Sequence, residues 1–447
     1  MNSDEFRKYG KEMVDYVADF WDHIRERRPL PNIKPGYIKD VVPSNAPPEP
    51  EDWSTIFNDL EEVVMKGNTY WHHPHFFAYF PTACSYPAII ADILSGGIAG
   101  IGFSWKSGPA MTELEMATLD WLVDALALPE HFKNSHPGNG CGIIQCTASD
   151  ATMIAIMSAR AKAVEEIKNG SWMVDDKGLN KISEAEQADA DMLYPHFHDP
   201  AVFQKFVAYC SDQVHYYGGL INRTATNTFR EDRARGLIPF TLIATMGTTS
   251  SCGMDRLDEL APICNREHIW LHVDAAYAGS FLTCPEFRYM SRGVELVDSF
   301  NFNSHKSMLV NFDCSPMWFK DGVTITKYFN VDATYLKHEY QAAAADYRQN
   351  EQAMLFAKLV TESDDFELFV PQHLGLVCFR IKGSTNEENE ALCAAINDDR
   401  RIHLVPSKVH GKFFLRFVVC SQLSTDDDIR FAFDVCKEIL AKIRNDV

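Results

Sequence analysis

The chain has 447 residues, of which 46% are apolar and 23% charged, a composition typical of a globular protein with a large core. Its formal net charge of −20 argues against nucleic acid or an anionic membrane surface as the main partner. The twelve cysteines include no pair at C-x-x-C spacing, and no apolar run approaches the roughly 18 residues of a membrane span. Because the first residues show no secretory signal pattern, we expect a cytoplasmic protein with reduced thiols.

The amino-terminal part of the sequence predicts a helix followed by an extended arm. Apolar residues recur at three- and four-residue steps between residues 3 and 25, which indicates an amphipathic helix. Residues 29–50 contain seven of the chain's 21 prolines, which is typical of an extended connector that lies over another surface. Neither segment makes a core alone, so we expect both to pack against a neighbour such as a second subunit.

From about residue 110 onward, apolar strands alternate with helices. A helix over 112–128 precedes a strand at 143–146 and a second helix at 150–167, and polar residues 168–200 indicate a surface insertion. Further strands are predicted at 206–210, 239–246, 269–275, 299–303 and 316–319. Continuous apolar strands that alternate with helices predict a mostly parallel sheet covered on both faces.

The last hundred residues predict a small α+β domain. A short helical segment begins near residue 350, strands follow at 374–381 and 413–420, and a final helix covers 426–443. We therefore predict three parts, an amino-terminal helix and arm at 1–85, a large α/β domain at 86–348 and a small domain at 349–447.

Several groups of chemically capable residues follow predicted strands, where open α/β sheets bind their ligands. Thr147, Ala148 and Ser149 join a strand to a helix, and backbone N–H groups there could hold a phosphate, although an ordinary helix cap has the same pattern. Asp274 lies in an apolar strand, where a carboxylate is costly unless it is paired with a cation. That cation could be a protonated ring nitrogen of a cofactor or a partner in a structural ion pair.

A histidine and a lysine complete this set. His215 follows the strand at 206–210 and could stack on a flat ligand, or it could be an ordinary loop histidine. Lys306 follows the strand at 299–303; burial would lower its pKa and make it nucleophilic, whereas a lysine that extends into solvent would have no such role. Together the phosphate cradle, the carboxylate, the histidine and the lysine describe a site for pyridoxal phosphate.

These residues stand in motifs that resemble the group II pyridoxal-phosphate-dependent decarboxylases, most closely those animal members that act on aromatic L-amino acids. The motifs are HFFAYFPT at 75–82, GFSW at 102–105, SDQ at 211–213 with His215, LHVDAAYAG at 271–279, NFN at 301–303 with His305 and Lys306, and NFDC at 311–314. The resemblance extends to residues 5–17 and over nearly the whole chain, apart from the insertion at 168–200.

The resemblance implies an α/β fold of the fold-type I pyridoxal-phosphate-dependent transferase kind. It implies a homodimer with its active sites at the subunit interface, in which residues 1–85 clasp the partner. Pyridoxal 5'-phosphate would be the cofactor, attached covalently to Lys306, with Asp274 at its ring nitrogen and His215 stacked on its ring. The remaining cofactor contacts implied are Ala148, Ser149 and Asn303 at the phosphate, with His305 beside them, and Thr249 and Ala276 along the ring.

The resemblance also implies a substrate pocket and a proton donor. The pocket residues implied are Tyr79, Phe80, Pro81, Thr82 and His215, with Ile101 and Phe103 from the other chain. Tyr335 would lie on a mobile loop and deliver a proton to the carbanion left by CO2. The implied reaction is the decarboxylation of an aromatic L-amino acid of the DOPA, tyrosine or 5-hydroxytryptophan type to its amine. No metal, nucleic acid or membrane is expected to take part.

Two departures from the family pattern leave alternatives open. Ser307 stands where these enzymes usually have tryptophan. After Tyr347 the chain passes almost directly into the small domain, so that a long helix and the loop leading to it are absent. Because the missing segment includes part of the pocket wall, histidine decarboxylation remains an alternative. A catalytically impaired homologue that dimerises with an active paralogue is the other.

Overall fold

The structure is a computed structural model that describes residues 1–80, 82–102, 105, 107–168, 200–210, 218–329, 347–372, 374–419, 421 and 423–445. The chain forms two compact units. The first comprises Met1–Ile93, Val123–Pro129 and Ile144–Trp318, and the second comprises Leu94–Leu122, Glu130–Ile143 and Phe319–Val447. The division at residues 85 and 348 stays a prediction. Within the described ranges, no helix is both long and apolar enough to cross a lipid bilayer.

The first helix, α1 (Ser3–Asp22), begins with a capping box. The side chain of Asn2 accepts hydrogen bonds from the N–H groups of Asp4 and Glu5, and the Glu5 carboxylate accepts one from the N–H of Asn2. The helix ends at Asp22, slightly before the predicted end at residue 25, and the 3-10 turn η1 (Ile24–Glu26) follows.

The proline-rich arm contains little regular structure, as predicted. Between residues 29 and 50 the only helical turn is the 3-10 segment η2 (Tyr37–Asp40). The helix α2 (Trp53–Asp59) follows, and it passes without a break into a π-helical segment, η3 (Leu60–Met65).

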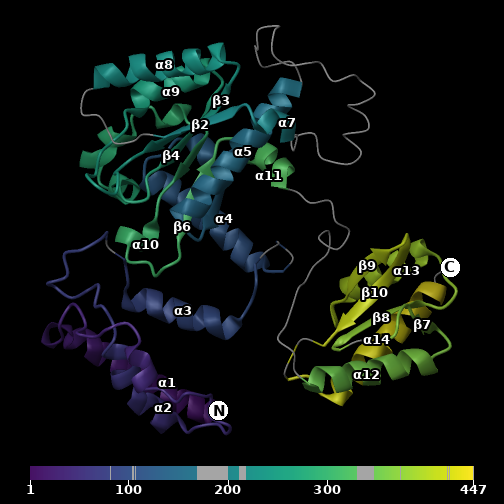
Figure 1. The fold of residues 1–447 in the computed structure, drawn as a ribbon. Helices are drawn as coiled ribbons and strands as arrows, with labels where there is room; N and C mark the ends of the chain where they lie inside the picture. Colours follow the sequence, from purple (N-terminus) through teal and green to yellow (C-terminus); the bar gives the residue numbers. More distant parts are fainter. Residues whose placement is uncertain are drawn as a thin grey trace. The chain divides into compact units, whose positions relative to one another are not determined.

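A six-stranded sheet organises the middle of the chain (Figure 1). Its strands are β1 (Cys141–Gln145), β2 (Phe206–Cys210), β3 (Ile238–Thr245), β4 (Trp270–Asp274), β5 (Ser299–Asn301) and β6 (Ser315–Phe319), in the order β1-β6-β5-β4-β3-β2. The adjacent pairs from β2 to β5 are parallel, as predicted. Each predicted strand is present within a few residues, although β5 ends two residues before the predicted end.

Helices cover the central strands. β3 packs against α5 (Ala148–Lys168) and α8 (Gly218–Ala234), and β4 packs against α5 and α9 (Leu257–Arg266). This two-sided cover explains why β3 and β4 are buried along almost their whole length. The other helices before residue 330 are α3 (Tyr86–Ile98), α4 (Pro109–Ala125), α7 (Pro200–Phe203), α10 (Ser304–Ser307) and α11 (Gly322–Phe329), with 3-10 turns η4 (Glu130–Phe132), η6 (Ala278–Thr283), η7 (Pro285–Ser291) and η8 (Val294–Leu296).

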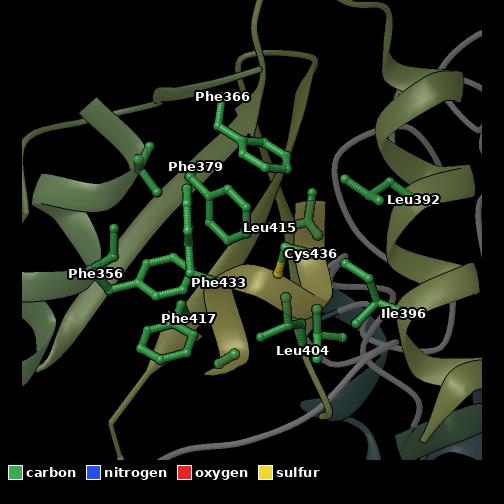
Figure 2. Packing of buried hydrophobic residues seen from close by; sticks show 14 of the residues in the cluster. Phe356, Phe366, Phe379, Leu392, Ile396, Leu404, Leu415, Phe417, Phe433 and Cys436 are labelled. Atoms are coloured by element: carbon green, nitrogen blue, oxygen red, sulfur yellow. The ribbon is translucent and has the colours of Figure 1, made fainter. Parts of the chain in front are cut away.

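The end of the chain builds its own core, as the predicted small α+β domain requires. Its elements are α12 (Tyr347–Glu362), β7 (Phe366–Leu368), β8 (Leu376–Ile381), α13 (Asn386–Asp399), β9 (Val405–Val409), β10 (Lys412–Val418) and α14 (Asp426–Asn445). The strands form an antiparallel sheet in the order β7-β8-β10-β9. Figure 2 shows Phe356 of α12 with Phe379, Phe417 and Phe433 in the core between this sheet and its helices. A helix begins near residue 350, as predicted, but α12 has 16 residues and is longer than the short segment expected.

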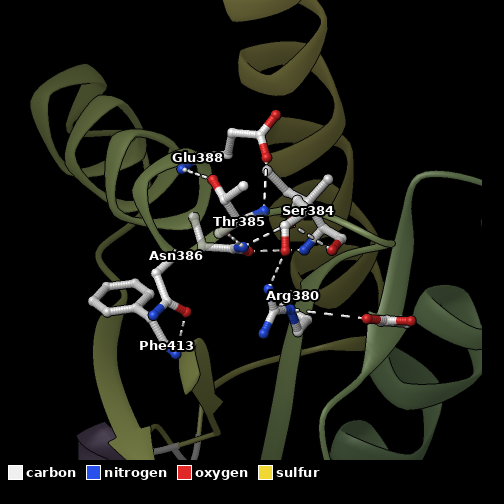
Figure 3. A network of polar contacts seen from close by, with 9 residues as sticks. Arg380, Ser384, Thr385, Asn386, Glu388 and Phe413 are labelled. Carbon is white, nitrogen blue, oxygen red and sulfur yellow. Dashed lines mark hydrogen bonds and ion pairs between the residues drawn. The ribbon is translucent and has the colours of Figure 1, made fainter. Parts of the chain in front are cut away.

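A polar network ties the start of α13 to this sheet (Figure 3). Thr385 and Glu388 form a capping box, and Arg380 of β8 donates to the carbonyl of Ser384 just before the helix. The Asn386 side chain accepts from the N–H of Phe413 in β10 at 2.8 Å. These contacts satisfy polar groups that the helix end would otherwise leave unpaired.

We expect Phe379→Ala to destabilise the C-terminal sheet by about 3–5 kcal/mol, because it leaves a cavity in a fully buried aromatic cluster. Native-state hydrogen exchange of the β8 and β10 amides measures this loss as a lower opening free energy. Leu423→Ala is the control, since that side chain is 81% exposed. Equal amide protection in the two variants would contradict the packing described.

Candidate active site

Lys306 lies on a short helix that follows the carboxyl end of β5. Asn303 precedes this helix, α10, and its N–H donates to the carbonyl of Ala276 at 3.2 Å. The Lys306 side chain is half-buried, and its Nζ lies 5.2 Å from the centroid of the Phe80 ring. Burial lowers the pKa of Lys306, and the nearby Asp274 carboxylate opposes this effect. A lysine so placed is easier to deprotonate than one in water.

Asp274 is the last residue of β4 and is largely buried. Its Oδ1 accepts a hydrogen bond from the N–H of Ala276 at 3.0 Å. Burial raises the pKa of Asp274, and the Ala276 N–H and the Lys306 charge counteract it only in part. The charge of the carboxylate is therefore only partly compensated, and a protonated ring nitrogen would be a suitable further partner.

His272 lies two residues before Asp274 on the same face of β4 and is fully buried. Its Nδ1 is 2.9 Å from the Ser299 hydroxyl, which also accepts from the indole N–H of Trp270 at 3.0 Å. Burial lowers the pKa of His272 to about 3, so the ring is neutral near neutral pH. It supports the strand without adding a charge beside Asp274.

The helix α5 points its amino terminus toward the carboxyl end of β4. Thr152, near the start of α5, lies 3.5 Å from His272 Nε2, whereas Lys162, further along, lies against Trp270 at the start of β4. The helix and the strand therefore run antiparallel. Consequently Ala148 and Ser149, in the first turn of α5, are near the strand end that carries Asp274.

Thr147 is the cap of α5, as the simpler interpretation of this motif predicted. Its hydroxyl oxygen accepts from the N–H of Asp150 at 3.1 Å, and its hydroxyl donates to the Asp150 carboxylate at 2.8 Å. A cap of this kind satisfies one N–H of the first turn and leaves others for an anion. The cap and the phosphate cradle are therefore compatible.

His305 is buried beside Lys306, and its ring lies against Phe312 with the centroids 4.2 Å apart. The N–H of Cys314 donates to His305 Nδ1 at 2.9 Å, so in the neutral ring the proton is on Nε2. Burial and the Lys306 charge lower the pKa of His305. The ring is thus held as a neutral donor.

Buried hydrogen bonds orient the Asn303 side chain. Asn301 donates from Nδ2 to the Ser315 hydroxyl at 2.8 Å, and that hydroxyl donates to Asn303 Oδ1 at 2.6 Å. Since its oxygen is engaged, the Nδ2 end of Asn303 is the end suited to donate to an anion. Asn301 and Ser315 were not predicted as site residues; Asn301 lies within the predicted strand at 299–303, and Ser315 directly precedes the predicted strand at 316–319.

A cavity of about 600 Å³ lies beside Lys306 and His305. Six aromatic residues contribute to its wall: Phe20, Tyr70, Trp71, Tyr79, Phe80 and Phe312. Phe80 is itself packed on Tyr277, with ring centroids 4.2 Å apart. A mostly apolar cavity with a few polar groups at one part of its wall suits a flat organic ligand.

The structure brings several predicted site residues together and leaves others apart. Tyr79, Phe80 and Thr82 line the cavity with His305 and Lys306. Thr249 is exposed in the turn after β3, and Ile101 is 64% exposed in the second compact unit. Ser307 is exposed. Outside the described residues lie Pro81, Phe103, His215 and Tyr335.

These residues fit pyridoxal 5'-phosphate. The buried carboxylate of Asp274 suits a protonated ring nitrogen, and Lys306 is near enough for its charge to act on that carboxylate. The amino terminus of α5 suits a phosphate. Within the described ranges no cluster of histidine, cysteine, aspartate or glutamate could hold a metal ion.

Comparison with known proteins gives the same result. Residues 35–352 match the pyridoxal-dependent decarboxylase conserved domain. The aromatic-L-amino-acid decarboxylases of Drosophila melanogaster and Mus musculus are each 42% identical to the chain, covering 99% of it and 91% and 99% of the relatives.

Solved structures are similar over the whole chain. Catharanthus roseus tryptophan decarboxylase in complex with L-tryptophan is 29% identical, with a TM-score of 0.64. The Oryza sativa enzyme TDC with pyridoxal phosphate and tryptamine is 27% identical, with a TM-score of 0.65. In both cases 99% of each chain is covered.

The predicted α/β fold, the cofactor and the carboxy-lyase class are confirmed by these matches, which extend over most of the chain. The half-buried Lys306, the largely buried Asp274 and most of the cavity-lining residues fall within the matched residues 35–352, whereas Phe20 and Ile24 precede them. The chain belongs to the pyridoxal-dependent decarboxylase family.

Proposed function

We propose that the chain converts an aromatic L-amino acid, of the DOPA, tyrosine or 5-hydroxytryptophan type, to its amine and CO2. The observation that carries this proposal is the aromatic-lined cavity that reaches Lys306. The relatives from fly and mouse are named aromatic-L-amino-acid decarboxylases, and the plant structures were solved with L-tryptophan or tryptamine. Aromatic side chains favour an aromatic ligand through offset and edge-to-face contacts.

Lys306 and Asp274 would act on the cofactor from two sides. When bound, the protonated cofactor ring accepts the electron pair that departing CO2 leaves behind. Asp274 keeps the ring nitrogen protonated through a charge-assisted hydrogen bond. Lys306 attaches the cofactor, and its lowered pKa leaves more of the amine unprotonated for that attack.

The phosphate would be held by the N–H groups of Ala148 and Ser149, by Asn303 Nδ2 and by His305 Nε2–H. The antiparallel course of α5 and the orientation of Asn303 by Ser315 support these roles. Ala276 would border the cofactor ring, because its N–H donates to the Asp274 carboxylate. Thr249 keeps the role that the family resemblance implies.

The substrate ring would contact Tyr79, Phe80 and Thr82, which line the cavity. Further roles rest on the family resemblance alone: Pro81 and His215 at the substrate, Ile101 and Phe103 from the other chain, and Tyr335 as proton donor. Since a tyrosine hydroxyl has an unperturbed pKa of about 10, it can donate a proton at neutral pH.

We also propose that the protein is a homodimer. Each of the 13 residues of α3 is at least partly exposed, although this helix is strongly apolar. Ile90, Ile93, Leu94 and Ile98 are each more than half exposed. A helix with so much exposed apolar surface is typical of a protein interface. The cytoplasmic location stays a prediction.

The chain lacks a number of residues that its relatives have. Its alignment with the fly enzyme spans 493 positions, whereas the chain has 447 residues, so at least 46 aligned positions of the fly enzyme have no counterpart in this chain. This difference supports the predicted loss of a segment, although its position after Tyr347 stays a prediction. The activity test below therefore also distinguishes an impaired enzyme and a histidine decarboxylase from the proposed function.

The products of the cofactor-loaded protein test the proposed function. With DOPA, tyrosine, 5-hydroxytryptophan and histidine offered separately, we expect amine and CO2 in equal amounts from an aromatic substrate. One solved relative, 27% identical, is a Rhodiola rosea 4-hydroxyphenylacetaldehyde synthase, so aldehyde and peroxide are also measured. Aldehyde as the main product, amine only from histidine, or no turnover at all would each overturn the proposal.

We expect borohydride, which fixes a lysine–cofactor bond by reduction, to place the cofactor on Lys306. The reason is its combination of partial burial, lowered pKa and proximity to Asp274. Peptide mass spectrometry locates the label, and Lys306→Arg should lose it while the positive charge is kept. A label on another lysine in the unmodified protein would show that Lys306 does not attach the cofactor.

Asp274→Asn should lower the pKa of Lys306 further in cofactor-free protein. Burial already lowers this pKa, and the variant removes the negative charge that opposes burial. The pH midpoint for acylation of Lys306, followed by peptide mass spectrometry, should therefore shift downward. Glu295→Gln, an exposed site elsewhere in the first unit, is the control. An unchanged or raised midpoint in Asp274→Asn would contradict the electrostatic coupling.

A further inference from the structure

The amino-terminal helix contributes to the cavity beside Lys306. Phe20, near the end of α1, and Ile24, in η1, line the same cavity as Lys306. Ile24 is only 7% exposed. This wall therefore comes from a part of the chain almost 300 residues away from Lys306, and neither residue is among the pocket residues that the family resemblance implies.

Arg27 connects this wall to the π-helical segment η3. Its guanidinium makes a two-pronged ion pair with Glu61, with Nη2–Oε1 and Nη1–Oε2 distances of 2.6 and 3.0 Å. It also donates to the Tyr70 hydroxyl at 3.0 Å. The carbon of the guanidinium lies 5.7 Å from the Phe20 ring centroid and 5.5 Å from that of Tyr70. One side chain thus contacts two aromatic residues of the cavity wall.

Glu61 lies in the π-helical segment η3, a feature that is frequent at functional sites. The carboxylate of Glu61 also accepts from the Tyr16 hydroxyl at 2.7 Å. At the end of the same segment, the carbonyl of Met65 accepts from the Tyr70 hydroxyl at 2.5 Å. The segment thereby holds both Arg27 and Tyr70.

The charges in this group are stable over a wide pH range. The hydrogen bond from Arg27 lowers the pKa of Glu61, and that same contact raises the pKa of Arg27. Burial, helped by Glu61, raises the pKa of Tyr16 to about 12. The Arg27–Glu61 ion pair and the neutral Tyr16 hydroxyl are therefore maintained near neutral pH.

We propose that Arg27 and Glu61 are positioning residues that hold Phe20, Ile24 and Tyr70 as a specificity wall for the substrate's aromatic ring. The inference deepens the proposed function, on which it rests for the aromatic nature of the ligand. A purely stabilising role is the competing explanation. The pair is partly exposed, with side-chain exposures of 27% and 54%, and the ligand affinities measured below distinguish the two explanations.

Arg27→Lys tests the positioning role, because lysine keeps the charge but cannot make the two-pronged contact. The full-length, cofactor-loaded protein is titrated calorimetrically with tryptamine and with tyramine as probes. We expect both dissociation constants to rise roughly tenfold, as is typical for the loss of close apolar contact. The visible absorbance of the bound cofactor should not change, because Lys306 and Asp274 are untouched.

Ile24→Ala tests the wall itself and does not depend on the ion pair. The smaller side chain enlarges the cavity, so the affinity for tryptamine relative to tyramine should rise roughly threefold to tenfold. Arg7→Lys and Val14→Ala are the matched controls on α1. Arg7 pairs with Asp4 at an exposed site, Val14 is 53% exposed, and neither lines the cavity. Both controls should bind the two amines as the unmodified protein does.

Unchanged dissociation constants in Arg27→Lys together with an unchanged affinity ratio in Ile24→Ala would overturn the inference. So would failure of the unmodified protein to bind either amine. If Arg27→Lys does not fold, the ratio measured with Ile24→Ala decides. If the unmodified protein binds the amines but forms none from any aromatic amino acid, the proposed function fails, whereas the altered affinities would still support the wall.

Discussion

The electrostatic coupling of Asp274 and Lys306 is the constraint on which the site depends. A carboxylate at the end of a buried strand is costly, and so is a half-buried ammonium group. Burial favours the neutral form of each, whereas each charge favours the ionised form of the other. The fold provides this balance because β4 ends, and α10 begins, close enough together for the two charges to interact.

The residues behind this pair are neutral. His272 is fully buried without a charge, and Asn301 and Ser315 are linked by hydrogen bonds that end on Asn303. Neutral polar groups can orient the site without adding a further charge beside Asp274 or Lys306. The aromatic wall of the cavity comes largely from residues before 83, far from Lys306 in the sequence. In the proposed site, the cofactor and the substrate would therefore be contacted by different segments.

The sequence predicts the central sheet well because β3 and β4 are continuous apolar runs covered on both faces. Asp274 and Lys306 could be predicted because a charged residue at the end of such a run is unusual. β9 was missed because Pro406 argues against a strand, although an edge strand tolerates it. The contacts of Ser315 with Asn303 and of Arg27 with Glu61 join distant segments, and no local pattern reveals such pairs.

The π-helical segment η3 sets a limit on chain length near the cavity. Its wide turn, seen in the hydrogen bond from Lys66 N–H to the carbonyl of Glu61, accommodates one more residue than an α-helical turn. Deletion of one residue would replace this wide turn by an α-helical one and change the positions of the Glu61 carboxylate and the Met65 carbonyl, which contact Arg27 and Tyr70. Related chains that keep these contacts should therefore vary in side chains along this segment more readily than in its number of residues.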